Sequence, residues 1–300
     1  MVELRTKGLV SIVTPCLNGS AFLRATIASI LNQSYPSIEY IFVDGGSTDA
    51  SVKIALESGE RIRILRLEGS SQARAINAGF EQASGEFVAF VNADDALEPS
   101  MVAEAIEALA AEPGAPYAYG RARFIDAAGE ALGTYPVKPF SRDALMHECI
   151  VCQPATLIRA DALERVGGLE EAYAYALDYD LWIRFAESQP PPAYRERIWA
   201  SARMHANAKT FRDRELVYRE VVSMVRRHYG YVPFSWIHAY AGYLVDGRDQ
   251  FFEPPKGSLR RSLLTLAMGV RENGVQAPRF VAEFGRESLR LRHNARVHTA

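Results

Sequence analysis

Three polar residues follow a short apolar run near the middle of the sequence. Residues 87–91 have the length and composition of a buried strand, and Asn92, Asp94 and Asp95 come directly after it. Adjacent carboxylates repel each other, and a divalent cation with oxygen ligands is a natural partner for them. The pattern predicts a metal site. The alternative left open is a solvated turn in which an aspartate caps the helix that starts near Pro99.

Two more acids follow another predicted strand. Asp44 ends the strand over residues 38–43, and Asp49 closes the glycine-containing loop after it. Ligands of open α/β sheets bind at the carboxyl ends of the strands. We therefore expect Asp44, Asp49, Asp94 and Asp95 to meet at one edge of a sheet.

The elements that would position these acids alternate regularly. Strands predicted over 9–14, 38–43, 62–67 and 87–91 are separated by helical patterns and short connections, which favours an α/β fold with a parallel, doubly wound sheet. Neither a Gly-x-Gly-x-x-Gly after the first strand nor a P-loop motif is present, so dinucleotide-binding and P-loop classes lose their support.

The second half adds an antiparallel pair (117–125 and 131–137), a strand near 153–158 and a helix within 174–187. Asp178 stands at the start of that helix, where it is either a catalytic base or an acid favoured by the helix dipole. Further on, Arg203, His205 and Lys209 form a cationic cluster. Such a cluster fits a metal–pyrophosphate site, and a surface loop with incidental charge is the alternative.

The composition indicates an ordinary globular protein. The chain has 300 residues, 48% of them hydrophobic, and a formal net charge of −2, which gives no electrostatic case for nucleic-acid binding. The first residues lack the apolar core of a signal peptide, and no apolar run approaches the roughly 18 residues of a membrane span, so we expect a cytoplasmic protein. Cys16, Cys149 and Cys152 are expected to be buried thiols.

Beyond Phe211 the pattern is helical and increasingly basic. Residues 256–300 hold nine lysines and arginines against three glutamates, so this stretch either lies on an acidic membrane surface or forms a solvated helical face. Two apolar stripes at helical spacing are visible in this part of the chain: Val217, Val221, Met224 and Val225, and then Leu259, Leu263, Leu266 and Val270.

The motifs, taken in order, strongly resemble the family 2 glycosyltransferases over roughly residues 8–212. They are Ser11-Ile-Val-Thr-Pro, Val43-Asp-Gly-Gly-Ser-Thr-Asp, Ala75-Ile-Asn-Ala-Gly, Asn92-Ala-Asp-Asp, Gly167-Gly-Leu, Asp178-Tyr-Asp-Leu-Trp and Arg203-x-His-x-x-x-Lys-Thr. The resemblance implies the glycosyltransferase A fold, with a mostly parallel nucleotide-binding sheet flanked by helices. It implies a nucleotide-sugar half (1–98) and an acceptor half (99–212). The resemblance does not reach the rest of the chain, where the apolar stripes predict a helical C-terminal extension (213–300).

The resemblance also implies roles for single residues. Asp178 matches the catalytic base, and Asp94, Asp95 and His205 match contacts to Mn²⁺ or Mg²⁺. The acceptor is expected near Gln153 and Trp182. The residues expected to bind the nucleotide sugar are Thr14, Pro15, Asp44, Asp49, Arg74, Asn77, Asn92, Ala93, Asp94 and Lys209.

The sequence departs from the family pattern in places. Asn92 stands where an aspartate is commoner, and Arg74 where relatives often carry an acid. The Gln-x-x-Arg-Trp motif and membrane spans of processive members are absent, which favours transfer of one sugar per encounter.

The expected activity is therefore an inverting, metal-dependent transfer from a nucleotide-diphosphate sugar, UDP favoured, to a hydroxyl of a glycan or lipid-linked acceptor in bacterial-type cell-surface glycan synthesis. Two alternatives are a nucleotidyltransferase, whose basic glycine-rich loop is missing here, and a non-catalytic nucleotide-sugar-binding module, whose signature would be binding without turnover.

Overall fold

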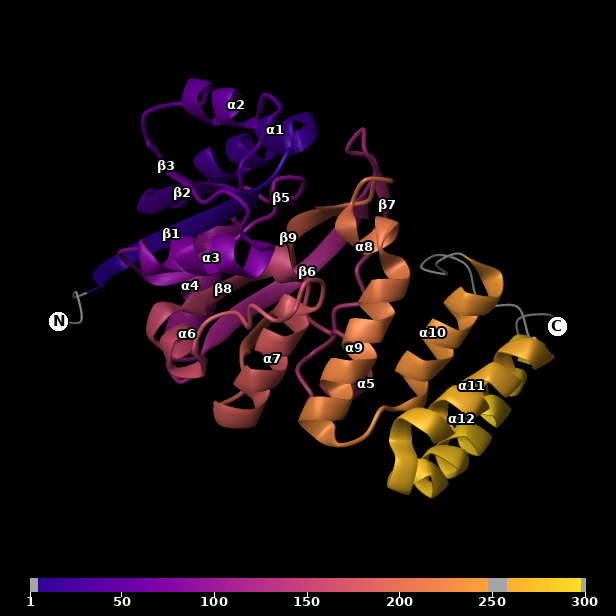
Figure 1. Ribbon diagram of the computed structural model, residues 1–300. Coiled ribbons are helices and arrows are strands. Elements are labelled where there is room, and N and C mark those ends of the chain that lie inside the picture. Colours follow the sequence, from indigo (N-terminus) through magenta and orange to yellow (C-terminus); the bar gives the residue numbers. More distant parts are fainter. Residues whose placement is uncertain (1–4, 248–257, 298–300) are drawn as a thin grey trace. The chain divides into compact units, whose positions relative to one another are not determined.

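The computed structural model describes residues 5–247 and 258–297 (Figure 1). The chain forms two compact units, one from residues up to 140 together with 150–206, and one from 141–149 together with 207 onward. The second unit therefore begins a few residues before the predicted extension at 213, and it includes a short segment from the middle of the chain.

The first unit is built on one sheet with the strand order β3-β2-β1-β4-β8-β6-β9-β5, and β7 pairs with β6. Six strands run in one direction, and the short strands β5, β7 and β8 run against them. This confirms the prediction of a mostly parallel sheet. The strands are β1 (Thr6–Cys16), β2 (Ile38–Asp44), β3 (Ile62–Arg66), β4 (Gly85–Phe90), β5 (Ala96–Leu97), β6 (Tyr117–Ile125), β7 (Ala131–Thr134), β8 (Thr156–Arg159) and β9 (Ala193–Arg203).

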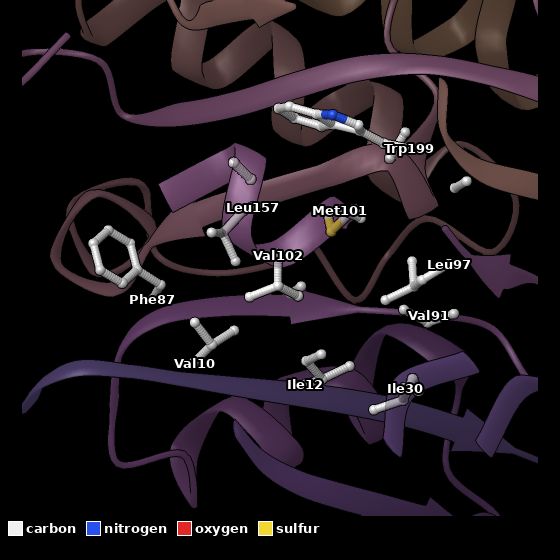
Figure 2. Close-up of a cluster of buried hydrophobic side chains, with 14 of the residues drawn as sticks. Val10, Ile12, Ile30, Phe87, Val91, Leu97, Met101, Val102, Leu157 and Trp199 are labelled. Atoms are coloured by element: carbon white, nitrogen blue, oxygen red, sulfur yellow. The ribbon is translucent and has the colours of Figure 1, made fainter. Parts of the chain in front are cut away.

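Helices cover both faces of this sheet. The helices α1 (Ser20–Leu31), α2 (Ser51–Glu57) and α4 (Met101–Ala111) pack on one face, and α3 (Gln72–Glu81), α6 (Ala160–Val166) and α7 (Leu177–Ser188) belong to the other. Figure 2 shows part of the hydrophobic core between the sheet and α1, α2 and α4. In it, Val10 and Ile12 of β1 face Met101 and Val102 of α4, and Trp199 of β9 lies nearby. Burial of these alternating strand residues is the main force that holds the layers together.

The strand order reverses direction between β1 and β4. The chain moves outward from β1 to β2 and β3, and then returns through α3 to β4 on the other side of β1. Right-handed crossovers put α1 and α2 on one face and α3 on the other. In sheets of this kind the ends of the two strands beside the reversal border a crevice, which is the expected place for a ligand.

The second unit is helical. It contains α5 (Arg142–His147), α8 (Lys209–Arg212), α9 (Arg214–Tyr229), α10 (Phe234–Asp246), α11 (Leu259–Asn273) and α12 (Ala277–Val297). Its own core is formed mainly by aromatic and aliphatic residues of α9, α10 and the segment between them, with Met268 and Phe280 from α11 and α12. Among the described residues, no helix is both long and apolar enough to cross a membrane.

The two predicted apolar stripes of this unit behave differently. Val217, Val221, Met224 and Val225 are buried, as the pattern indicates. In α11, by contrast, Leu259, Leu263 and Val270 face outward, and the helix buries Arg261, Thr265, Met268 and Gly269 instead.

A glycine allows α3 to lie close to the sheet. A Cβ atom on Gly79 would be 2.4 Å from Val13 Cγ1 in β1, closer than two carbon atoms can approach. The final glycine of the Ala75-Ile-Asn-Ala-Gly motif is therefore required by packing.

We expect Gly79→Ala to lower the free energy of unfolding by about 1–2 kcal/mol, because crowding in a packed core, which costs about 1–3 kcal/mol, outweighs the gain of up to about 1 kcal/mol in helix propensity. Urea denaturation followed by circular dichroism measures this. Gly114→Ala is the matched control, since a Cβ there meets nothing within 4 Å. A Gly79→Ala protein as stable as the control would contradict the prediction.

Candidate active site

Three predicted site residues lie at neighbouring strand ends beside the reversal. Cys16 of β1 pairs with Asp44 of β2, so these two strands end together. The neighbouring β4 ends earlier, with Phe90 opposite Val13, and the Val91 N–H then donates to the Val13 carbonyl at 2.9 Å. Asp44 and Thr14 are both buried, and Thr14 accepts a hydrogen bond from the Tyr40 hydroxyl. Thr14, Pro15 and Asp44 thus lie together at one edge of the sheet, and their contact with a nucleotide stays a prediction.

The loops that follow β1 and β2 are joined by side-chain hydrogen bonds. The Asp49 carboxylate accepts from the backbone N–H of Ser20 at 3.0 Å and of Ser51 at 2.9 Å, and so satisfies the starts of both α1 and α2. Burial raises the pKa of Asp49, but the hydrogen bonds from Ser51 and Ser20 outweigh it and lower the pKa to about 2. Asp49 therefore has a structural task, which the prediction of a nucleotide contact did not foresee.

Asn92 is the centre of a polar network after β4. Its Oδ1 accepts from Gln72 Nε2 at 2.8 Å, and its Nδ2 donates to Asp95 Oδ2 at 3.2 Å and to Gln153 Oε1 at 3.4 Å. Gln153, from the 3₁₀ turn Gln153–Ala155, also donates to the Phe90 carbonyl and is buried. Gln72 belongs to this network although the sequence analysis did not select it.

The two neighbouring carboxylates point to different surroundings. Asp94 is 31% exposed, and its Oδ2 lies 3.0 Å from His205 Nε2. Asp95 is only 6% exposed, and its Oδ1 accepts from the Arg203 N–H at 3.0 Å. Burial, together with the charge of Asp94, raises the pKa of Asp95. The structure thus supports Asp94 and His205 as a pair but does not support Asp95 as a metal ligand, because protein groups already occupy both of its oxygens.

Arg203 and Phe22 hold this arrangement in place. The Arg203 guanidinium donates to the carbonyls of Asp94 at 2.9 Å and Asp126 at 2.8 Å, and it lies over the Phe22 ring. The His205 ring packs against the same Phe22, with 4.7 Å between centroids. Sequence reasoning assigned Arg203 to phosphate and missed Phe22, an aromatic residue on α1 that no motif marks.

The Asp94–His205 pair offers one carboxylate oxygen and one imidazole nitrogen, donors that suit Mn²⁺ and, less well, Mg²⁺. In the part of the chain that the structure describes, no group of three or more His, Cys, Asp or Glu side chains could hold a metal. The pair fits a divalent ion, and the remaining ligands of such an ion would come from a bound substrate and water.

Asp178 lies in the first turn of α7 and is partly buried. Burial raises the pKa of its carboxyl to about 6, although the backbone N–H groups of Tyr179 and Asp178 lower it. Trp182, one turn further along, is completely buried and packs against Tyr117 of β6 with 4.9 Å between ring centroids. Trp182 thus anchors α7 to the sheet, and the expected acceptor contact does not fit its burial.

Asn77 connects α3 to the loop that leads to α7. Its Oδ1 accepts from the Leu169 N–H at 2.9 Å and its Nδ2 donates to the Leu169 carbonyl at 2.8 Å. Gly168 approaches this amide with a positive φ of 73°. The structure therefore gives Asn77 a fastening role in place of the predicted contact with the nucleotide sugar.

The remaining predicted residues have various surroundings. Arg74 is exposed and pairs with Glu81 at 3.2 Å and Glu171 at 3.6 Å. Ala93 lies close to Gly19: a Cβ atom added to Gly19 would be 2.9 Å from the Cβ of Ala93. Lys209 belongs to the second unit, so its contact with a nucleotide sugar stays a prediction.

Comparison with known sequences identifies relatives of this chain. The family model "Glycosyl transferase family 2" matches residues 11–167, just over half of the chain. The chain is 33% identical over 194 residues to the O-antigen biosynthesis protein RfbC of Myxococcus xanthus, covering 63% of this chain and 15% of that protein. It is 31% identical over 192 residues to an uncharacterized glycosyltransferase of Rickettsia prowazekii, covering 59% and 58%. The chain thus spans less than two thirds of these curated relatives.

Solved structures with the same fold are more distant in sequence. Staphylococcus aureus TarS 1–349 in complex with UDP-GlcNAc superposes with a TM-score of 0.61 at 16% identity, covering 90% of this chain and 81% of that one. The mannosyltransferase PcManGT of Pyrobaculum calidifontis, in complex with GDP-Man and Mn²⁺, gives 0.59 at 16% identity and covers 93% and 80%.

These likenesses, together with the strand order of the sheet, assign the glycosyltransferase A fold to the chain. Within that class, the chain belongs to glycosyl transferase family 2.

We expect Arg203→Lys to lower the free energy of unfolding by about 1–3 kcal/mol, because an ammonium group cannot reach the Asp94 and Asp126 carbonyls together and leaves one of them without its charged donor. Urea denaturation of the variant measures this. Arg197→Lys, at a side chain that is 72% exposed, is the control and should change little. Equal free energies of unfolding for the two variants would show that the Arg203 hydrogen bonds do not stabilise the fold.

Proposed function

We propose that the chain is an inverting, metal-dependent glycosyltransferase that moves one sugar from a nucleotide-diphosphate sugar to an acceptor hydroxyl. The observation that carries the proposal is the Asp94–His205 pair, 3.0 Å apart, after the strand that borders the sheet's reversal. The neighbours bound to UDP-GlcNAc and to GDP-Man with Mn²⁺ support a nucleotide-sugar donor and a divalent ion. UDP is the favoured nucleotide.

The donor half would bind the nucleotide. Thr14, Pro15 and Asp44 stand at the strand ends at which the nucleoside is expected. Asn92 Oδ1 accepts from Gln72, and its second lone pair would accept from a ribose hydroxyl. Asp94 and His205 would hold Mn²⁺ or Mg²⁺ against the diphosphate. When bound, the ion supplies Lewis-acid stabilisation of the negative charge that develops on the leaving group.

Asp178 would act as the general base. A carboxyl with a pKa of about 6 is largely ionised at neutral pH, and it is a better proton acceptor than an ordinary aspartate. It would take the proton of the acceptor hydroxyl while that oxygen attacks the anomeric carbon from the face opposite the diphosphate. Displacement in line then inverts the configuration at that carbon.

The relatives suggest the kind of product. RfbC is named for O-antigen biosynthesis, and a chondroitin synthase of Escherichia coli is 27% identical over 191 residues, covering 62% of this chain and 28% of that protein. We therefore propose a glycan or lipid-linked acceptor in bacterial-type cell-surface polysaccharide synthesis, with the reaction on the cytoplasmic side.

Calorimetry with UDP, GDP, dTDP and CDP, each with Mn²⁺ and with EDTA, tests the donor site. We expect one nucleotide to bind in a metal-dependent way, and Asp94→Ala to weaken that binding by at least about 100-fold, because the ion loses its only carboxylate from the paired ligands. Glu107→Gln, at an exposed position of α4, is the control and should bind as wild type. A folded protein that binds no nucleotide would overturn the proposal.

Removal of the base should separate binding from turnover. We expect Asp178→Asn to lower kcat by about 10²–10⁴-fold while nucleotide affinity stays within a few-fold of wild type. At pH values below about 6 the kcat of wild type should decrease, because Asp178 becomes protonated. Measurement of nucleotide release against pH checks both points. Nucleotide binding without turnover in wild type would instead favour the non-catalytic module.

The same substitution should stabilise the protein. Because the folded-state pKa of Asp178 lies above its ordinary value, ionisation of this carboxyl costs stability as pH rises from about 4 to about 6. We expect Asp178→Asn to recover roughly 1–3 kcal/mol above pH 6 and nothing below pH 4. Thermal unfolding at several pH values measures this, with Asp161→Asn, an exposed i,i+4 partner of Arg165, as control. A pH-independent difference would contradict the assignment.

A further inference from the structure

Charge is divided unequally between the two units. Residues 141–149 and 207–300 contain seventeen lysines and arginines against eleven aspartates and glutamates, whereas the rest of the chain contains seventeen against twenty-five. A near-neutral chain therefore has a basic helical unit and an acidic catalytic unit. Such an asymmetry favours an anionic partner for the helical unit.

The helix α11 has an apolar face that no described element covers. Leu259 is 76% exposed, Leu263 60% and Val270 41%, and Leu266, at the same spacing, is partly exposed. At 100° per residue these four positions point away from Thr265 and Met268, which face the core. The leucines and the valine thus lie on the side of the helix opposite the core, and they are not used for packing within the unit.

Positive charge borders this outer face, which we call the α11 stripe (Leu259, Leu263, Leu266 and Val270). Arg260 is exposed next to its first leucine, and Arg271 follows Val270. Glu272 pairs with Arg271 at 2.7 Å and also with Arg226 at 2.9 Å, so one acid serves two arginines and a net positive charge remains. Arg261, by contrast, is buried and neutralised by Asp246.

The spacing of the stripe would also suit packing against a helix of a second copy of the chain, but its length and the charge of the unit do not. The alternation of four and three residues lasts less than two heptads, whereas helix pairs in water usually need three or four. A second copy would also bring an equally basic unit to the contact. Leucines bordered by arginines are the composition of helices that lie in a lipid–water interface.

We propose that the α11 stripe docks the protein on a membrane surface that contains anionic lipids. Leu259 and Leu263 enter the boundary between head groups and acyl chains, and Arg260 and Arg271 stay at the level of the lipid phosphates. Binding of this kind needs no transmembrane helix, and it does not depend on the transferase proposal, since it involves no donor-site residue.

Co-sedimentation of the full chain with vesicles tests the proposal. We expect binding to vesicles of phosphatidylcholine with one third phosphatidylglycerol, weaker binding at high salt, and little binding to phosphatidylcholine alone. Leu259→Gln with Leu263→Gln should reduce the partition coefficient by at least about tenfold, and Arg260→Gln by a few-fold. Leu56→Gln, at a 66% exposed leucine of α2 in the other unit, is the matched control and should bind as wild type.

Either of two results would overturn the proposal. One is wild type that stays in the supernatant with anionic vesicles, and the other is an unchanged partition coefficient in the double leucine variant. Light scattering without lipid tests whether a second copy of the chain covers the stripe instead. If wild type is a dimer and the double leucine variant is a monomer, a second copy covers the stripe and the membrane proposal is wrong. Circular dichroism confirms that each variant is folded, which is expected since the substituted side chains are exposed.

Discussion

The neighbouring carboxylates of Asp94 and Asp95 repel each other at the end of a buried strand, and the candidate site depends on how the fold separates them. Asp95 turns inward to the Arg203 N–H and the Asn92 amide, and Asp94 turns outward to His205. Arg203, the partner of Asp95, ends β9, and His205, the partner of Asp94, follows it by two residues. The short pairing of β5 with β9, in which Ala96 lies opposite Ser201, places that segment beside the acidic loop.

The family motifs act partly through packing. Gly79 lets α3 approach β1, and Asn77 fastens the same helix to the backbone of Leu169. Since that loop leads into α7, one helix of the donor half also holds the segment that carries Asp178. A motif residue can therefore be indispensable to the site without touching a substrate, because the positions of the reacting groups depend on the rigidity of their supports.

Local patterns predicted what depends on local sequence. The four parallel strands, the strand-end acids and the hairpin of β6 and β7 follow from periodicity and turn residues. The β5–β9 pairing joins residues about a hundred positions apart, so no window of sequence reveals it, and with it the roles of Arg203 and Phe22 were missed. Periodicity shows that an apolar stripe lies on one side of α11, but it cannot tell whether that side meets the core. The structure places Leu259, Leu263 and Val270 on the exposed side.

The departure at Asn92 is explained by the burial of Asp95. An aspartate at position 92 would place a third carboxylate beside Asp95, where Asn92 now donates an N–H to Oδ2 at 3.2 Å. An ionised aspartate has no proton to donate, so it would replace a hydrogen bond with a repulsion at a nearly buried site. The amide satisfies Asp95, accepts from Gln72 and leaves Asp94 as the exposed carboxylate of the loop. Asn92 thus satisfies the inward-facing Asp95 by a hydrogen bond. Because the motif has an amide at this position, its exposed negative charge lies on Asp94, which faces His205.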